Sequence, residues 1–187
     1  MREAATLRVR PDGLRLAVVT LADLTTRQKE EIVALCSRAF AEEDFGTLFE
    51  LVSGSTHILA WLERRLVGHA LFGERRLQPE GLPELRTAYV DAVATDPELQ
   101  GRGIGSAVME RLAASIRDFE FGGLSTERPS FYARLGWERW PGPLAVRGPD
   151  GIVETPDDIV MILRTPRTPQ LDARSRLVAD WRPHHPW

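Results

Sequence analysis

The residues best suited to chemistry lie in a glycine-rich stretch near the middle of the chain, where Gly101, Gly103 and Gly105 recur at alternate positions. Residues 89–95 form an apolar, β-branched run that is typical of a buried strand, and residues 104–116 carry apolar side chains at helical spacing. A strand, a glycine loop and the start of a helix, in that order, offer an anion bare main-chain N–H groups and the positive end of the helix dipole. The stretch therefore predicts a phosphate-binding loop.

The spacing of these glycines excludes two common nucleotide-binding motifs. Ser106 holds the position of the third glycine in the dinucleotide motif G-x-G-x-x-G, and no Gly-Lys-Ser/Thr follows as it does in a P-loop. The residues do fit the pattern Gln-x-x-Gly-x-Gly, with Gln100, Gly103 and Gly105. The alternative is a tight turn with a glycine-rich helix entry. The strand before the loop and the helix after it favour the binding loop.

The elements that must position this loop form a mixed pattern of helices and strands, which indicates the α+β class. Apolar runs predict strands over 14–20, 56–62, 66–77, 85–95, 122–125, from 137 onward, and over 159–163. Helical spacing predicts helices from an N-cap at 24–26 to Phe40, over 104–116, over 131–137 with Gly136 as its C-cap, and at the start of 171–187. Turn residues at 11–13 predict a flexible segment over 1–13, followed by a single domain over 14–187.

Composition narrows the classes of function. With 27 acidic and 24 basic residues the net charge is -3, so no basic field indicates nucleic-acid binding. No apolar run approaches the length of a membrane span, and the N-terminus lacks the layout of a signal peptide, so we expect a cytoplasmic protein without a membrane partner. Cys36 is the only cysteine and is expected to be a small core residue. The adjacent His184 and His185 lack a third ligand, and we expect no metal.

Two motifs resemble the GCN5-related N-acetyltransferase superfamily. The loop from Gln100 to Gly105 resembles the acyl-CoA pyrophosphate loop of that superfamily. The segment Phe131-Tyr-Ala-Arg-Leu-Gly-Trp137 is similar to its helix after the fifth strand, which carries a tyrosine ahead of a Gly-Phe or Gly-Trp pair. The motifs occur in the right order, about 30 residues apart, and together they are far more specific than either alone. The resemblance implies a central mixed, mostly antiparallel twisted sheet flanked by helices.

More closely, the chain resembles the aminoglycoside 2'-N-acetyltransferases. The likeness runs through 89–94, 134–137 and 140–143, and reaches Asp180-Trp-Arg182 and a final tryptophan, which are not general superfamily features. It implies transfer of an acetyl group from acetyl-CoA to the 2'-amine of an aminoglycoside, a polycationic small molecule. It also implies antibiotic resistance as the outcome and a homodimer as the assembly.

The resemblance also implies a direct-transfer mechanism with two catalytic side chains. The amine must lose a proton, the oxyanion needs main-chain N–H donors, and the departing thiolate needs a proton. Asp91 stands where the family has glutamate and is expected to be the base, acting through water because it is one methylene shorter. Tyr132 is expected to be the acid. The alternatives are a strand-edge carboxylate bonded to local backbone for Asp91 and an aromatic core residue for Tyr132.

The remaining site residues are assigned by the same resemblance. The expected acetyl-CoA contacts are Val93 and Thr95 to the pantetheine arm, and Gln100, Gly101, Arg102, Gly103, Gly105 and Ser106 around the pyrophosphate. Arg102 either adds a cation there or is a solvated loop charge. A polycationic amine calls for an acidic, open cleft. The expected substrate contacts are Asp44, Ala92, Ser125, Asp158 and the C-terminal carboxylate of Trp187. Leu48 and His185 depart from the family, because acids are expected there.

Two other functions remain open. In the first, a protein with the same fold and chemistry acetylates another amine, such as a cell-wall amino sugar, a polyamine or a peptide. The departures from the family at Leu48 and His185 favour this alternative. The second is a non-catalytic acyl-CoA-binding sensor in which Asp91 no longer acts as a base. The residue that separates an enzyme from a sensor is therefore Asp91.

Overall fold

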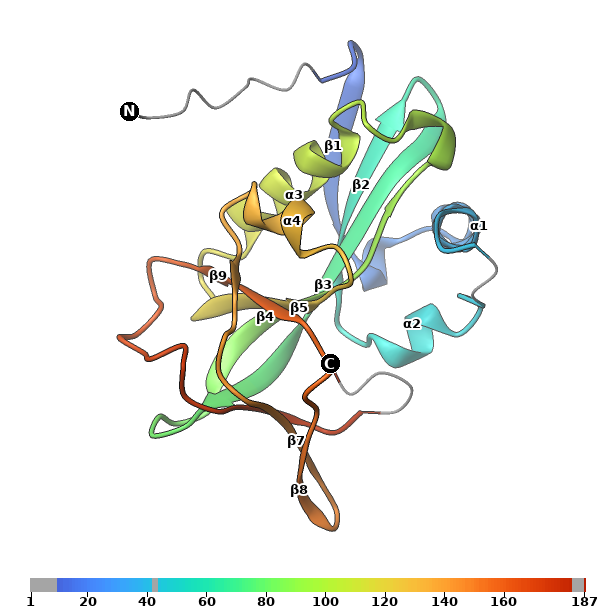
Figure 1. Ribbon diagram of the computed structural model, residues 1–187. Coiled ribbons are helices and arrows are strands. Elements are labelled where there is room, and N and C mark those ends of the chain that lie inside the picture. Colours follow the sequence, from blue (N-terminus) through green and yellow to red (C-terminus); the bar gives the residue numbers. More distant parts are fainter. Residues whose placement is uncertain (1–9, 42–43, 183–186) are drawn as a thin grey trace, which may run out of the picture. The chain divides into compact units, whose positions relative to one another are not determined.

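A computed structural model describes residues 10–41, 44–182 and 187 of the chain (Figure 1). Most of the expected flexible segment 1–13, and both His184 and His185, lie outside these residues. The chain divides into two compact units, one formed by Met1–Leu71 and Ala92–Leu112 and the other by Phe72–Asp91 and Ala113–Trp187. Two strands, β3 (Arg65–Pro79) and β4 (Leu85–Thr95), run through both units.

The first unit is built on an antiparallel ladder. Strand β1 (Leu14–Thr20) pairs with β2 (Thr56–Leu62), and β2 in turn pairs with β3 (Figure 1). Its helices are α1 (Thr26–Ala39), α2 (Leu48–Leu51) and the part of α3 (Ile104–Ser115) up to Leu112. It also contains two 3-10 turns, η1 (Leu21–Asp23) and η2 (Pro97–Leu99). The predicted strands and helices of this unit are confirmed.

Helix α1 begins where the sequence places its cap. The Thr25 hydroxyl accepts from the Gln28 main-chain N–H at 3.2 Å, and the Gln28 side chain accepts from the Thr25 N–H at 2.9 Å. This reciprocal capping box satisfies two donors that a helix start leaves unpaired. The helix then buries one face, including Cys36, in an apolar cluster with α2, β2, β3 and the end of β4. Cys36 is fully buried there, and burial raises the pKa of its thiol to about 12.

The second unit is a mixed sheet in which antiparallel pairs predominate. Its strands follow the order β6-β9-β5-β4-β3-β10-β7-β8. The strands not yet bounded are β5 (Phe121–Ser125), β6 (Glu138–Arg139), β7 (Leu144–Gly148), β8 (Gly151–Glu154), β9 (Val160–Arg164) and β10 (Leu177–Asp180). Strands β4 and β5 run parallel, as do β7 and β10, while β3 with β10, β5 with β9, β6 with β9, and β7 with β8 are antiparallel. The expected α+β class with a mixed, mostly antiparallel sheet is confirmed.

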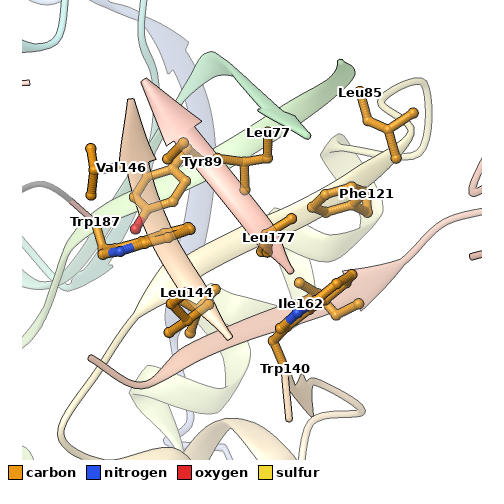
Figure 2. Close-up of a cluster of buried hydrophobic side chains, with 12 residues drawn as sticks. Leu77, Leu85, Tyr89, Phe121, Trp140, Leu144, Val146, Ile162, Leu177 and Trp187 are labelled. Carbon is orange, nitrogen blue, oxygen red and sulfur yellow. The ribbon is translucent and has the colours of Figure 1, made fainter. Parts of the chain in front are cut away.

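The core of this unit lies on one face of the sheet. Figure 2 shows side chains from β3, β4, β5, β7, β9 and β10 gathered with Tyr89, Trp140 and Trp187. Trp140 is 2% exposed and Trp187 3% exposed, and the indole N–H of Trp140 donates to the Ser175 carbonyl at 2.9 Å. Trp187 therefore packs as a core residue of the sheet.

Three details of the predicted elements are wrong. The stretch 171–187 does not begin as a helix; it turns at Asp172–Ser175 and then enters β10, because Leu177, Val178 and Ala179 are buried between β3 and β7. Strands β7 and β8 were not predicted. The helix expected over 131–137 is α4 (Pro129–Ala133), which starts on proline at its first turn. No helix among the described residues is long and apolar enough to cross a membrane.

Candidate active site

The glycine loop in the first unit is anchored by a buried carboxylate. Asp96 follows the last residue of β4, and its Oδ1 accepts from the Glu98 N–H at 3.2 Å, which caps η2. Its Oδ2 accepts from Arg65 at 2.7 Å and from Arg38 at 3.3 Å, while its side chain is fully buried. Burial alone would raise the pKa of Asp96, but the hydrogen bonds from Arg65, the Glu98 N–H and Arg38 leave it lowered. The strand end that feeds the loop is therefore fixed.

The loop itself has the conformation that its glycines predict. Gly101 has φ +78° and Gly103 has φ +79°, both in the left-handed region that is costly for other residues. The first helical bond of α3 runs from the Ala107 N–H to the Gly103 carbonyl at 3.0 Å, so the amides of 104–106 precede the bonded pattern of the helix. Gly105 lies within this first turn and Arg102 is exposed. The loop thus offers an anion main-chain donors at a helix start.

Strand β4 changes course immediately before this loop. Ala92 has φ +51°, one of three non-glycine residues with positive φ in the described part of the chain. Its carbonyl oxygen lies 2.9 Å from His69 Nδ1. Val93 and Thr95 follow on the same strand, and both are half-buried. Two predicted cofactor contacts therefore come directly after a strained turn of the main chain.

In the second unit, Asp91 is held by an arginine from the C-terminal segment. Arg182 Nη1 and Nη2 donate to the two carboxylate oxygens of Asp91, each at 2.9 Å, and Arg182 Nη2 also donates to the main-chain oxygen of Trp187 at 3.0 Å. Both paired side chains are about three-quarters buried, at 28% and 27% exposed. Burial would lower the pKa of Arg182, but the hydrogen bond and charge of Asp91 raise it above its ordinary value. Arg182 is thus a candidate site residue to which the sequence analysis assigned no role, although it ends the Asp-Trp-Arg match.

A buried tyrosine lies beneath this pair. The guanidinium carbon of Arg182 lies 4.9 Å from the centre of the Tyr89 ring, and that of Arg75 lies 4.7 Å from it. Burial raises the pKa of the Tyr89 phenol, whose hydroxyl has no hydrogen-bond partner among the described residues. Tyr89 and Trp187 belong to the same cluster (Figure 2). The Tyr89 ring therefore supports the guanidinium that holds Asp91.

The expected C-terminal contacts are partly brought together. The Trp187 indole N–H donates to the Thr155 hydroxyl at 2.7 Å, and the Asp158 N–H donates to the Thr155 carbonyl at 3.3 Å. Thr155 thus links the Trp187 ring to the loop that carries Asp158. Arg182 links the main chain of Trp187 to Asp91. Ser125 lies exposed at the end of β5, where it pairs with Val160 of β9.

Tyr132 is a core residue of α4 as well as a candidate acid. It is 8% exposed, and its ring meets those of Phe131 and Trp137 edge to face, with centres 4.9 and 6.1 Å apart. Burial raises the pKa of its phenol to about 12, with a smaller opposing influence from Arg128. The phenol is therefore protonated at neutral pH, as a proton donor must be.

The residue expected to contact substrate near the first helix belongs to the first unit. Asp44 is exposed and accepts from the Gly46 N–H at 2.8 Å, a local turn. Leu48 is 8% exposed and packs in the apolar cluster of the first unit, so it offers no polar contact. Among the described residues no group of three histidine, cysteine, aspartate or glutamate side chains is arranged to hold a metal ion.

Comparison with known proteins identifies the family of this chain. The family model for an acetyltransferase (GNAT) domain matches residues 20–140. An aminoglycoside 2'-N-acetyltransferase of Mycolicibacterium fortuitum is 31% identical over 178 residues, which cover 91% of this chain and 90% of that protein. The crystal structure of the Escherichia coli GNAT family N-acetyltransferase YhbS, in complex with CoA, covers 93% of both chains with a TM-score of 0.65 and 16% identity.

A longer relative shares only part of its length with this chain. The GCN5-related N-acetyltransferase of Kribbella flavida matches 70% of this chain with a TM-score of 0.57 and 23% identity, and this chain spans only 34% of it, about a third of its length. The family model nevertheless covers more than half of this chain, and the Mycolicibacterium fortuitum relative covers most of it. The chain therefore belongs to the GNAT acetyltransferases.

Proposed function

We propose that this GNAT acetyltransferase transfers the acetyl group of acetyl-CoA to the 2'-amine of an aminoglycoside. The observation that carries the proposal is the placement of Asp91 on β4, with both carboxylate oxygens held by Arg182, directly before the left-handed turn at Ala92. The 31% identity to an aminoglycoside 2'-N-acetyltransferase supports the choice of substrate. The exposed Asp44 and the half-buried Asp91 and Asp158 supply carboxylates for a polycationic amine.

The cofactor residues fit a nucleotide-bearing thioester. The left-handed Gly101 and Gly103 and the amides at the start of α3 form a loop suited to a pyrophosphate, and the exposed Arg102 adds a cation beside them. We assign the remaining contacts of this loop to Gln100, Gly105 and Ser106. When bound, acetyl-CoA supplies the thioester carbonyl that the amine attacks and the thiol that leaves. The main chain of Val93 and Thr95 then orients the donor.

Two side chains move protons in this mechanism. Asp91 accepts a proton from the substrate ammonium through a water molecule, so that the amine becomes a nucleophile. Tyr132 holds a phenol proton at neutral pH, because burial raises its pKa to about 12, and passes it to the departing sulfur. The main-chain amides after Ala92 stabilise negative charge that develops on the carbonyl oxygen.

The ion pair with Arg182 sets how Asp91 meets its substrate. Both Asp91 oxygens accept from the guanidinium, yet each carboxylate oxygen has a second lone pair for a water molecule. The ammonium groups of a polycationic amine are positively charged donors, as the Arg182 guanidinium is, so they can bind the same carboxylate. The ion pair therefore holds Asp91 in one orientation, and the remaining lone pairs can accept the proton that must be removed from the amine.

Thiol release from acetyl-CoA with kanamycin B and kanamycin A, measured side by side, tests the proposal. The two compounds differ at one position, a 2'-amine against a 2'-hydroxyl. Turnover with kanamycin B alone is the expected result. Equal turnover would move the acetylated site to another amine, and no release with either would remove the aminoglycoside assignment.

Resistance, cellular location and assembly are part of the same proposal. We infer a cytoplasmic homodimer whose expression raises the inhibitory concentration of 2'-amino aminoglycosides and leaves that of kanamycin A unchanged. Sedimentation velocity tests the dimer. An unchanged inhibitory concentration for kanamycin B, in cells that contain active enzyme, would exclude resistance as the outcome.

One observation favours a second candidate, acetylation of a different amine. Leu48, which stands where the resemblance places an acid, is packed in the apolar core of the first unit and cannot contribute charge. A cleft with fewer acids suits a less highly charged amine, such as a cell-wall amino sugar. Turnover with glucosamine-containing fragments and none with kanamycin B would establish this alternative.

A further inference from the structure

Two buried histidines form a hydrogen-bonded chain for which the proposed reaction has no use. Ser55 Oγ lies 2.9 Å from His57 Nε2, and His57 Nδ1, on β2, lies 3.0 Å from His69 Nε2, on β3. His69 Nδ1 then lies 2.9 Å from the carbonyl oxygen of Ala92 on β4. Ser55 is 1% exposed, and both histidines are fully buried. The chain of contacts therefore ends at a main-chain atom of β4, one residue after Asp91.

The acceptor at the end of this chain fixes every proton in it. The Ala92 carbonyl can only accept, so His69 Nδ1 must carry a hydrogen, and in the neutral ring His69 Nε2 is then bare. His57 Nδ1 therefore donates to His69 Nε2, which leaves His57 Nε2 to accept from the Ser55 hydroxyl. Both imidazoles are neutral in this arrangement, and burial lowers the pKa of His57 to about 4 and that of His69 to about 3.

The sulfur beside His69 does not compete for its proton. Cys36 Sγ lies 3.8 Å from His69 Nδ1, whereas the Ala92 oxygen lies 2.9 Å from the same nitrogen. Burial raises the pKa of the Cys36 thiol to about 12, so Cys36 contributes no negative charge at neutral pH. The N–H of His69 is therefore directed at the main chain of β4.

Ala92 needs such a partner because its conformation is strained. An L-residue other than glycine in the left-handed region loses about 1–2 kcal/mol, and Ala92 has φ +51° within a strand. The turn at Ala92 determines where the peptide groups of the next residues point. A hydrogen bond of 2.9 Å to its carbonyl from a neutral, buried ring opposes relaxation of the turn into an ordinary extended strand.

We propose that His69, held in one tautomer by His57 and Ser55, is a positioning residue that fixes the Ala92 carbonyl and so aims the main-chain amides after Ala92 at the acetyl donor. This role rests on the proposed use of an acyl-CoA donor. His69 does not touch the reacting atoms; it acts through the Ala92 peptide. Every hydrogen bond in the chain is donated toward β4, from the Ser55 hydroxyl through His57 and His69 to the Ala92 carbonyl.

Three variants separate positioning from simple structural support. His69→Leu removes the donor, and His69→Asn places an amide N–H near the position of His69 Nδ1, which donates to the Ala92 carbonyl. Leu71→Ala is the matched control, since Leu71 is fully buried on β3 two residues from His69 and its loss leaves a cavity without a missing hydrogen bond.

The expected result is a loss of kcat/KM for acetyl-CoA of about tenfold or more in His69→Leu, comparable with the displacement of an oxyanion donor. His69→Asn should recover most of it, because it restores a donor to the Ala92 carbonyl. Leu71→Ala should lower the melting temperature with little change in kcat/KM. Equal kcat/KM in His69→Leu and the wild type overturns the proposal. So does a loss in Leu71→Ala that matches the loss in His69→Leu at the same melting temperature.

Two readouts keep this test separate from the identity of the amine. Calorimetric binding of acetyl-CoA to the same variants reports on the β4 amides even if no aminoglycoside is acetylated. Nitrogen-15 spectra of the wild-type histidines should show both His57 and His69 as neutral Nδ1–H tautomers at pH 7. An Nε2–H tautomer or a charged ring at His69 would overturn the proposal, whereas an absence of thiol release with every amine would count only against the proposed substrate.

Discussion

Asp91 and Arg182 form a two-bonded ion pair, with both carboxylate oxygens 2.9 Å from guanidinium nitrogens, although they lie far apart in the sequence. The same guanidinium stacks on the Tyr89 ring and donates to the main-chain oxygen of Trp187. Arg182 therefore ties the candidate base on β4 to the segment that follows β10. Two parallel hydrogen bonds between the planar guanidinium and the carboxylate allow Asp91 little freedom of orientation. A fixed orientation suits a carboxylate that must receive a proton at a fixed place.

Replacing Asp91 by Asn separates an enzyme from a sensor. The change keeps the shape of the side chain and removes its ability to accept a proton, so kcat should fall by about 100-fold or more. Acetyl-CoA affinity should remain, because the glycine loop is unchanged. Thiol release and calorimetry measure the two quantities. Asp157→Asn, an exposed carboxylate in the loop before β9, is the control. Unchanged turnover at saturating acetyl-CoA would remove Asp91 from the mechanism.

Removal of the Arg182 guanidinium should cost stability as well as activity. Arg182→Met leaves the half-buried Asp91 carboxylate without its charged donors, so the free energy of unfolding should fall by about 1–3 kcal/mol. Arg182→Lys keeps the positive charge but cannot donate to both carboxylate oxygens in one plane, so its free energy of unfolding should lie between those of the wild type and Arg182→Met. Urea unfolding measures the difference. Arg174→Met, at an exposed position, is the control. Identical unfolding curves for Arg182→Met and the wild type would mean that the pair contributes nothing measurable.

Local signals in the sequence were sufficient for most of the fold. The capping box at Thr25 and Gln28, the alternating apolar residues of β1 and the continuous apolar run of β2 are each determined by chemistry within a few residues. The same holds for the left-handed glycines at 101 and 103. Strand β10 was missed because its three apolar residues have no pattern of their own, and only the pairing with β3 and β7 makes them a strand.

The candidate site was predicted less completely than the fold for the same reason. The loop and its glycines follow from spacing, but the partner of Asp91 comes from a segment about 90 residues later, and no local pattern connects the two. The histidine chain is a similar case. His57 and His69 look like isolated core residues until the pairing of β2 with β3 brings His57 Nδ1 to 3.0 Å from His69 Nε2. Long-range pairing, which the sequence does not display, determines these contacts.

The loop glycine Gly103 should be indispensable for cofactor binding. Gly103→Ala places a Cβ at φ +79°, which costs about 1–2 kcal/mol and displaces the amides at the start of α3. We expect the acetyl-CoA dissociation constant to rise about tenfold or more, measured by calorimetry. Gly73→Ala is the matched control, because Gly73 lies in β3 with ordinary φ and a Cβ there would meet nothing within 4 Å. Equal affinity in Gly103→Ala and Gly73→Ala would exclude the loop from the cofactor site.

The buried histidines should make the protein sensitive to mild acid. Burial lowers the pKa of His57 to about 4, with a smaller effect of Lys29, and that of His69 to about 3, with a smaller effect of His57. An unfolded histidine has a pKa of about 6.5, so below that pH the unfolded chain binds more protons than the folded one, and stability falls as the pH falls. From pH 6.5 to 4, His57 alone should remove about 3 kcal/mol of unfolding free energy, since one pKa unit corresponds to about 1.4 kcal/mol.

Urea unfolding of the wild type and of His57→Gln across this pH range separates the contribution of His57 from that of the carboxylates. The variant should lose less stability than the wild type over the same interval, because it has one fewer group to protonate on unfolding, and parallel curves would show that His57 is already charged in the folded protein.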